Sequence, residues 1–245
     1  MKEIKLEEGE RLEDLQCKGL KIIQNKNYYT FTSDSVILAN FITTKKRDKC
    51  VEIGMGCGVI SILLSAKQSF DKIIGFELQK EMSMLAKKNV ELNHLIEKIE
   101  VVNDDIKNHA KYFENGSIDV VFSNPPYMVG GGENKNVVRD KARHEKSLPL
   151  HELTDVASKM LKHGGKFFLV YTAQRCAEVI HSLIDNKLEP KRMFFTQNGR
   201  GKVVLMVVEA VKGGKHGVKV LPELVTNEEN GDYLEKLHSK YFAGE

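Results

Sequence analysis

Four consecutive residues, Asn124, Pro125, Pro126 and Tyr127, follow an apolar run and carry the clearest chemical signal in the sequence. An amino group conjugated to a ring or a carbonyl has a delocalised lone pair, so it is a poor nucleophile. The side-chain oxygen of Asn124 and the carbonyl of Pro125 can accept both of its N–H bonds, because the prolines fix the backbone and remove N–H donors. Tyr127 can stack on a flipped-out base. We expect Asn124, Pro125 and Tyr127 to be catalytic toward a planar exocyclic or amide nitrogen; a rigid loop that only ends a strand is the alternative.

A glycine-rich turn lies earlier in the chain and leads directly into a helical pattern. Gly54, Gly56 and Gly58 let the backbone turn tightly and approach a ligand closely, and the helix N-terminus offers free N–H groups. The Gly-x-Gly-x-Gly spacing differs from the Gly-x-Gly-x-x-Gly pattern that holds a dinucleotide pyrophosphate. This difference favours S-adenosylmethionine over NAD as the cofactor, although such turns also occur for purely structural reasons.

Acidic residues follow at the ends of the next two apolar runs. Glu77 comes one βαβ unit after Gly58, where a carboxylate can accept hydrogen bonds from both hydroxyls of a ribose. Asp105 could accept the amino group of the cofactor's adenine while Ile106 covers the ring, and it is preferred to Asp104 for this role. The structural alternatives are that Glu77 stabilises a helix N-terminus and that Asp105 caps the next helix.

Short apolar runs alternate with amphipathic stretches, which is typical of successive βα units around a mostly parallel sheet. Strands are expected at about 50–53, 72–77, 99–103, 118–123 and 166–171. Helices are expected at about 59–68, 79–93, 106–112, 150–162 and 173–186. Several of the strands are continuously apolar, as is usual where helices cover both faces of a sheet. The pattern predicts an α/β fold with a doubly wound, mostly parallel, seven-stranded sheet.

The two ends of the chain have patterns of their own. Segments 20–24 and 28–31 flank Asn25-Lys26-Asn27 and predict a small N-terminal hairpin. A helix then begins at about Asp34, with Ser33 or Asp34 capping its free N–H groups. Near the other end, 191–196 and 203–209 flank a glycine-containing turn and predict an antiparallel hairpin at the edge of the sheet.

The composition is close to that of an average globular protein, with 41% hydrophobic and 29% charged residues. One domain is expected over 1–245, consisting of a hairpin and helix (1–45), a catalytic core (46–210) and a poorly patterned tail (211–245). No apolar run approaches the ~18 residues of a membrane span. The charged N-terminus leads into no signal-peptide core. We therefore expect a cytoplasmic protein without a membrane partner.

The four cysteines, at 17, 50, 57 and 176, form no CxxC pair and no cluster with histidine at zinc-ligand spacing. Free thiols and no metal site are expected. The net charge of +3 says little by itself. Its basic excess is concentrated in segment 134–146, which indicates an anionic substrate, and nothing in the sequence implies an obligate protein partner.

These motifs resemble those of the class I methyltransferases that act on amino nitrogens, which have a Rossmann-like fold and use S-adenosylmethionine. Four further stretches, at 20–24, 31–38, 142–145 and 188–192, resemble the bacterial tRNA adenine-N6 methyltransferases that modify the adenosine 3′ of the anticodon in a valine tRNA. The resemblance implies methyl transfer to the N6 amino group of adenine in tRNA. It implies a cofactor site formed by Ser33, Asp34, Glu52, Gly54, Gly56, Gly58, Glu77, Asp105, Ile106 and Asn124.

By the same resemblance, Arg143 and His144 lie on the substrate side of the pocket. The basic segment follows three glycines, so we expect Lys135, Arg139 and Lys141 to belong to a loop that closes on tRNA phosphates. A solvated surface loop is the alternative. The sequence departs from the family at Met128, where relatives often have Phe.

A second departure is in the last strand, where many relatives have Ala-Asn and this chain has Lys202-Val203-Val204. Other substrates present the same pair of N–H bonds to Asn124 and Pro125. They are an amino group in rRNA or DNA and the side-chain amide of a protein glutamine. A binding module without catalytic activity is a further alternative. A Rossmann oxidoreductase is disfavoured by the glycine spacing and by the Asn-Pro-Pro-Tyr motif, which has no role in hydride transfer.

Overall fold

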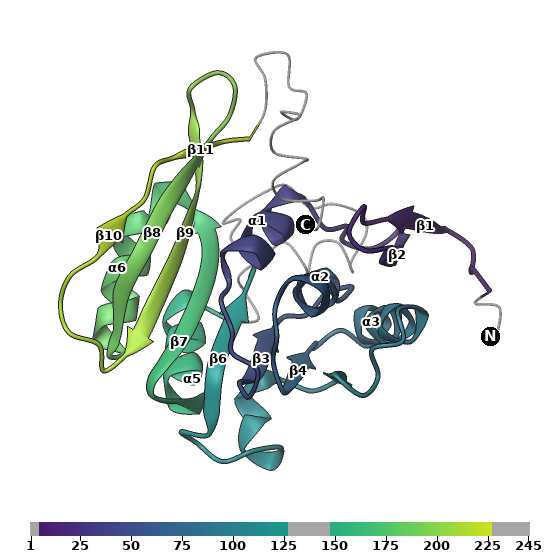
Figure 1. Ribbon diagram of the computed structural model, residues 1–245, viewed down its shortest axis with the longest axis horizontal. Coiled ribbons are helices and arrows are strands. Elements are labelled where there is room, and N and C mark those ends of the chain that lie inside the picture. Colours follow the sequence, from purple (N-terminus) through teal and green to yellow (C-terminus); the bar gives the residue numbers. More distant parts are fainter. Residues whose placement is uncertain (1–4, 127–147, 227–245) are drawn as a thin grey trace.

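Strands and helices alternate along the chain and form a central sheet with helices on both faces (Figure 1). The computed structural model describes residues 5–126 and 148–226. Several predicted site residues lie outside these ranges: Tyr127, Lys135, Arg139, Lys141, Arg143 and His144. In the described part of the chain, no helix is long and apolar enough to cross a membrane.

Seven strands form the main body of the sheet, in the order β8-β9-β7-β6-β3-β4-β5. Their bounds are β3 Lys49–Ile53, β4 Lys72–Phe76, β5 Ile99–Val102, β6 Ile118–Ser123, β7 Leu161–Thr172, β8 Leu188–Gln197 and β9 Val203–Lys212. The neighbours from β7 to β5 pair in parallel, and β9 is antiparallel to both β7 and β8. The predicted mostly parallel sheet is confirmed; these seven strands are joined by two short ones, so the sheet has nine strands among the described residues rather than the predicted seven.

The C-terminal hairpin is present, but only one of its strands lies near the edge of the sheet. Strand β9 lies between β7 and β8. Two short strands, β10 (Lys219–Val220) and β11 (Leu224–Val225), pair in parallel with β8 on its other side. The sequence did not reveal these strands, because two residues are too few to show a periodic pattern.

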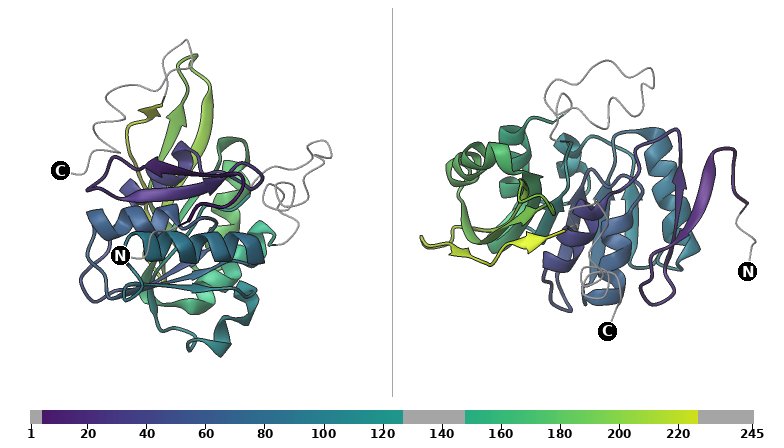
Figure 2. Two further views of the ribbon diagram at one scale, coloured as in Figure 1. Left: turned by 90° about the vertical axis from the view of Figure 1, so that its right-hand side faces the viewer. Right: turned by 90° about the horizontal axis from the view of Figure 1, so that it is seen from above.

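The helices divide between the two faces of the sheet, as a doubly wound fold requires (Figures 1 and 2). One face is covered by α1 (Ser33–Phe41), α2 (Val59–Lys67) and α3 (Lys80–Leu92). The other face is covered by the 3-10 helix η1 (Ile106–Lys111), α5 (Leu150–Met160) and α6 (Cys176–Asp185), the last preceded by the 3-10 turn η3 (Ala173–Arg175). Alternate residues of a strand point to opposite faces, so Cys50 and Val51 belong to different clusters.

The N-terminal hairpin forms between different segments from those predicted. Strand β2 (Lys21–Asn25) pairs antiparallel with β1 (Glu10–Asp14), which precedes it. Residues 28–31 form no strand, and the N–H of Phe31 donates to the side-chain Oε1 of Gln24 at 3.1 Å. The hairpin lies beside α3 (Figure 2), where Asn89 exchanges hydrogen bonds with the backbone N–H and C=O of Ile23.

Helix α1 begins at Ser33, one residue earlier than predicted. Thr32 occupies the N-cap position and its side chain forms no capping hydrogen bond. The predicted capping by Ser33 or Asp34 is therefore wrong, because both residues already belong to the first helical turn. The hydroxyl of Ser33 donates to the carboxylate of Asp34 at 3.5 Å.

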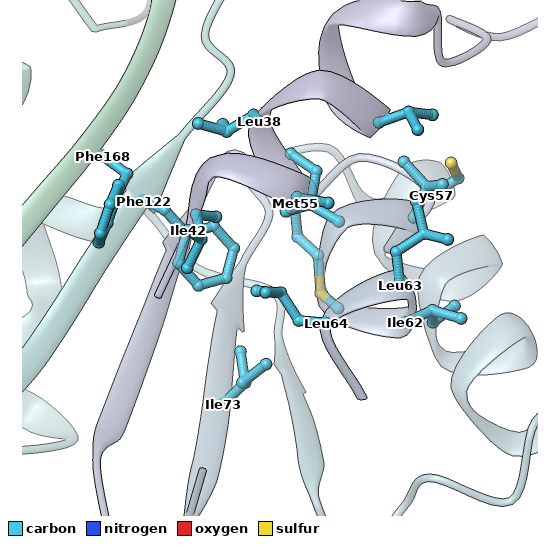
Figure 3. Packing of buried hydrophobic residues seen from close by; sticks show 14 of the residues in the cluster. Leu38, Ile42, Met55, Cys57, Ile62, Leu63, Leu64, Ile73, Phe122 and Phe168 are labelled. Atoms are coloured by element: carbon cyan, nitrogen blue, oxygen red, sulfur yellow. The ribbon is translucent and has the colours of Figure 1, made fainter. Parts of the chain in front are cut away.

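Side chains from α1, α2 and the strands meet in the larger of the two hydrophobic clusters, with Met55 among them (Figure 3). The four cysteines are free, as predicted, and burial raises the pKa of the Cys57 thiol to about 12. Within residues 5–126 and 148–226, no group of histidine, cysteine and carboxylate side chains could hold a metal ion.

Candidate functional site

The strongest chemical motifs lie side by side at the carboxyl edge of the parallel strands. Ile53 of β3 is level with both Phe76 of β4 and Ser123 of β6, and Phe76 is level with Val102 of β5. The residues that follow these strands are therefore neighbours, with roughly 4.8 Å between adjacent strands. Along this edge the order is Asn124, the glycine turn, Glu77 and Asp105. Ligands of open α/β sheets bind at this edge.

The glycine turn has a backbone that other residues rarely adopt. Gly54, Gly56 and Gly58 have φ angles of +72°, +57° and +88°, which is the left-handed region. The N–H groups of Gly54 and Met55 both donate to the carbonyl of Phe76, at 3.0 and 2.9 Å, so the turn is fixed to the end of β4. A Cβ atom on Gly54 would meet nothing within 4 Å, which leaves open space beside the backbone at this point.

The side chain of Met55 packs beneath the glycine turn, between the turn and strand β4. It is buried and lies against Gly75 of β4, where a Cβ atom would overlap its sulfur. The Met55 Cε atom would also lie 3.2 Å from a Cβ on Gly58. Glycine at 75 is thus needed for packing, although the sequence offered no motif that marks it.

Glu77 joins the turn to the loop that follows β4. Its Oε2 accepts a hydrogen bond from the N–H of Gly56 at 2.8 Å, and its Oε1 accepts one from the N–H of Gln79 at 2.9 Å. The residue is 8% exposed. Burial raises the pKa of Glu77 above its ordinary value, while these backbone N–H groups act in the opposite direction. The carboxylate is therefore buried against the turn, and each of its oxygens accepts a hydrogen bond from a backbone N–H group.

Glu52 lies beneath the turn and is only 1% exposed. Its Oε2 accepts a hydrogen bond from the hydroxyl of Ser61 in α2. The pKa of Glu52 is raised to about 8, mainly by burial and to a smaller extent by the nearby charge of Glu77, against the hydrogen bonds from Ser61. In this arrangement the hydrogen bond between Glu52 and Ser61 connects β3 to α2, the two elements that flank the glycine turn.

Asp104 and Asp105 follow β5 and have different partners. Asp104 accepts hydrogen bonds from Asn108 at 2.7 Å and from the Tyr112 hydroxyl at 2.9 Å, and these bonds lower its pKa to about 2. Asp105 caps η1 by accepting from the N–H of Lys107 at 2.9 Å through one oxygen. Capping was the structural alternative for this residue, and it leaves the second oxygen for another donor. Ile106 is buried.

Asn124 lies at the end of β6 and is half-buried. Its side-chain Nδ2 donates to the hydroxyl oxygen of Ser35 in α1 at 3.0 Å. The preceding residue, Ser123, donates from its hydroxyl to the carbonyl of Ile53 at 2.8 Å, which fixes the end of β6 to β3. Pro125 is buried and Pro126 is half-buried.

The structure brings most of the predicted residues together at one edge, including Ser33 and Asp34 in the first turn of α1, next to Ser35. It adds Ser35, Ser61 and Gly75, which sequence reasoning missed. Ser35 was within the segment quoted for the family resemblance, but its contact with Asn124 spans 89 positions. A sequence pattern within a short window cannot predict a contact between residues so far apart in the chain.

Comparisons with known proteins agree with this arrangement. The family model for the methyltransferase small domain matches residues 31–198. The tRNA1(Val) (adenine(37)-N6)-methyltransferase of Tolumonas auensis is 25% identical over 192 residues, which cover 78% of this chain and 79% of that protein. The protein of the same name from Bacteroides thetaiotaomicron is 28% identical over 156 residues, with 63% and 65% covered.

Solved structures share the fold at low sequence identity. A predicted O-methyltransferase from Agrobacterium tumefaciens superposes with a TM-score of 0.66 at 18% identity, covering 85% of this chain and 95% of that one. Methanocaldococcus jannaschii Trm5 in complex with adenosine gives a TM-score of 0.61 at 15% identity, with 86% and 58% covered.

Proposed function

Because this chain belongs to the methyltransferase small domain family, we propose that it transfers the methyl group of S-adenosylmethionine to the N6 amino nitrogen of adenine in tRNA. The adenosine 3′ of the anticodon in a valine tRNA is the proposed target. The observation that carries the proposal is the position of Asn124, which follows β6 directly beside the glycine turn after β3. Asn124, which is suited to bind an amino nitrogen, is thus next to the glycine turn, which is suited to bind a nucleoside cofactor.

The residues at this edge fit the cofactor. The space beside Gly54 is open to a ligand, and the turn needs no side chain there. Glu77 has further acceptor capacity for ribose hydroxyls, because each carboxylate oxygen accepts more than one hydrogen bond. The second oxygen of Asp105 and the apolar side chain of Ile106 suit an adenine. When bound, S-adenosylmethionine supplies an electrophilic methyl group on a sulfonium.

The chain's own residues hold the acceptor nitrogen. The Asn124 Oδ1 and the Pro125 carbonyl accept hydrogen bonds from its two N–H groups. These bonds direct the lone pair of the nitrogen toward the methyl group that it attacks. These hydrogen bonds strengthen as positive charge develops on the nitrogen, and for that reason they favour the transition state over the ground state. The methylated nitrogen then releases a proton to water, so no general base is required.

Support for a tRNA substrate comes from the names of the relatives and from a basic turn at the same edge of the sheet. Strand β8 runs parallel to β7, so its end and the start of β9 lie at the carboxyl edge; Figure 1 shows this connection projecting beyond the sheet. We call residues 198–202 the hairpin tip. Its Arg200 and Lys202 are exposed, and neither forms an ion pair with another described residue.

The hairpin tip is held in one shape. Asn198 Oδ1 accepts from the N–H groups of Arg200 and Lys202, at 3.1 and 2.9 Å, and Gln197 Nε2 donates to the carbonyl of Gly201 at 3.0 Å. Across the sheet the tip is two strands away from β6, or roughly 10 Å. Along the strands, Val203 lies five residues beyond Val208, which is level with Ser123 through Leu169, so the tip is roughly 20 Å from the end of β6. Two preorganised cations at this distance suit phosphates of the tRNA that lie several nucleotides away from a base bound at Asn124.

Mass spectrometry of nucleosides tests the proposal. Unmodified valine tRNA, incubated with the protein and S-adenosylmethionine, is expected to yield N6-methyladenosine at the position 3′ of the anticodon. A transcript with guanosine at that position should yield none. Methylation of another base, of DNA or rRNA alone, or of a glutamine-containing peptide would contradict the proposed substrate.

A further inference from the structure

We infer that Ser35 is a positioning residue for methyl transfer: its buried hydroxyl oxygen receives Asn124 Nδ2 and thereby turns Asn124 Oδ1 toward the acceptor amino group. This inference rests on the proposed function. Ser35 is 4% exposed, and its oxygen lies 3.0 Å from the Asn124 nitrogen.

The orientation of the amide decides whether Asn124 can bind an amino group. A carboxamide has one end that accepts hydrogen bonds and one that only donates, and a half-turn about its last side-chain bond exchanges the two ends. An acceptor amino group that offers two N–H bonds requires the oxygen. With Nδ2 held by Ser35, the oxygen faces away from α1 and toward the acceptor amino group. In the reversed orientation, the N–H groups of the Asn124 amide would face the N–H groups of the acceptor.

The serine hydroxyl is suited to act as the acceptor in this pair. A serine within a helix commonly gives its own proton to a backbone carbonyl one turn earlier, which leaves its oxygen to accept. The carbonyl of Thr32, three residues earlier, accepts from the Ser35 N–H at 3.2 Å, and the hydrogen-bond partner of the Ser35 hydroxyl oxygen is Asn124. An alanine at 35 would leave the Asn124 amide without the contact that distinguishes its two ends.

Both partners are on fixed supports, so the hydrogen bond has a defined geometry. Helix α1 is packed on the sheet through Phe41, whose ring lies edge-on to Phe168 and Phe194 with centroids 5.9 and 5.2 Å apart. The end of β6 is fixed by the hydrogen bond from Ser123 to Ile53. A rigid helix thus orients a residue 89 positions away in the sequence.

The inference is tested by kinetics of Ser35→Ala, with Ser83→Ala as the matched control. Ser83 is also a buried helical serine, but its hydroxyl has no hydrogen-bond partner among the described residues. Ser35→Ala should lower kcat about tenfold, as expected for loss of one hydrogen bond, while KM for tRNA and Kd for S-adenosylmethionine stay within about twofold. Ser83→Ala should keep the parental kcat.

A second variant, Ser35→Cys, keeps the shape of the side chain but replaces its oxygen by a larger sulfur that is a weak acceptor, so its kcat should lie between those of Ser35→Ala and the parent. In the Asn124→Ala background, Ser35→Ala should cause no further loss, because the amide that it orients is already gone. Parental kcat in Ser35→Ala and Ser35→Cys, or an undiminished loss in the Asn124→Ala background, would overturn the inference. Full activity of Asn124→Ala would instead refute the proposed mechanism, whatever Ser35 does.

Discussion

The carboxylate of Glu77 accepts a hydrogen bond from the backbone N–H of Gly56, with 2.8 Å between Oε2 and the nitrogen. The end of β4 and the turn after β3 are therefore joined by the side chain that is proposed to bind the ribose. Because the other oxygen is bonded to the N–H of Gln79, the carboxylate is fixed before any ligand arrives. Binding then requires little reorganisation of this side chain.

Replacing Glu77 by alanine should weaken binding of S-adenosylmethionine by at least ~1.5–3 kcal/mol, which is typical for hydrogen bonds to a charged group. Titration calorimetry measures this directly. Glu81→Ala removes the same charge from an exposed position in the first turn of α3, and should leave the affinity unchanged. A folded Glu77→Ala protein with parental affinity would exclude the residue from the cofactor site.

Asn124→Ala should reduce methyl transfer to a residual rate that is measurable only in single-turnover assays, and should leave the affinity for S-adenosylmethionine nearly intact. The lost hydrogen bonds go to the acceptor nitrogen and strengthen as it attacks, so the loss should appear in kcat. Single-turnover assays with labelled cofactor, combined with calorimetry, separate the two effects. A loss confined to cofactor binding would show that Asn124 belongs to the cofactor site alone.

Gly75→Ala should destabilise the protein by about 1–3 kcal/mol, because the new methyl group would overlap the Met55 side chain in a packed interior. Displacement of Met55 should also disturb the glycine turn and weaken cofactor binding. Denaturant unfolding and calorimetry measure the two effects. Gly164→Ala is a partial control, because a Cβ there meets nothing within 4 Å; its φ of +78° adds a backbone strain that Gly75, which is outside the left-handed region, does not have.

Glu52→Gln should stabilise the protein increasingly as the pH rises. Burial raises the pKa of Glu52 from 4.5 to about 8, so the folded state holds a proton that the unfolded chain loses above about pH 4.5. The parent therefore loses stability between those two pH values and no more above pH 8. Glutamine keeps an acceptor for Ser61 but has no proton to lose.

The free energy of unfolding, measured from pH 5 to pH 9, tests this prediction. The free energy of unfolding of Glu52→Gln should exceed that of the parent by little at pH 5 and by on the order of a few kcal/mol near pH 8, and the difference should stay constant above that pH. A difference between the two proteins that stays constant across this range would mean that Glu52 does not titrate as its burial implies.

The sequence predicted the strands from β3 to β6 well because they are short, mostly apolar runs separated by helical segments. It failed at β1, where Glu10, Arg11, Glu13 and Asp14 surround a single leucine and no apolar pattern marks a strand. The pairing of β1 with β2 depends on tertiary contacts, including the ion pair of Glu10 with Lys88 of α3. Patterns within a short window cannot contain such contacts.

The candidate site divides in the same way. Residues that belong to local motifs, such as Gly54, Glu77 and Asn124, were predictable because turns and strand ends demand particular residue types. Ser35 and Gly75 were not, because each serves a residue far away in the chain or across the sheet. In the sequence, Gly75 is simply a residue that does not favour a strand. Its role is apparent only from the structure, where the Met55 side chain occupies the space that a Cβ atom would need.

The hairpin tip gives the last prediction. Arg200→Gln combined with Lys202→Gln should weaken binding of valine tRNA and reduce the slope of log affinity against log salt by roughly 1–2, since each phosphate contact contributes ~0.7–0.9. Cofactor affinity should not change. The matched control is Lys46→Gln with Arg47→Gln, which removes two exposed positive charges from the loop before β3, at the opposite edge of the sheet.

The comparison separates a local contact from a general electrostatic effect. Both double variants lower the net charge by the same amount, so a non-specific attraction of tRNA to a basic protein would weaken equally in the two. Only contacts at the carboxyl edge predict that the slope falls for the hairpin tip and stays parental for the control. Equal slopes in filter-binding titrations of the two variants would remove the hairpin tip from the tRNA interface, and would leave Lys135, Arg139 and Lys141 as the predicted phosphate contacts to be tested by the same titration.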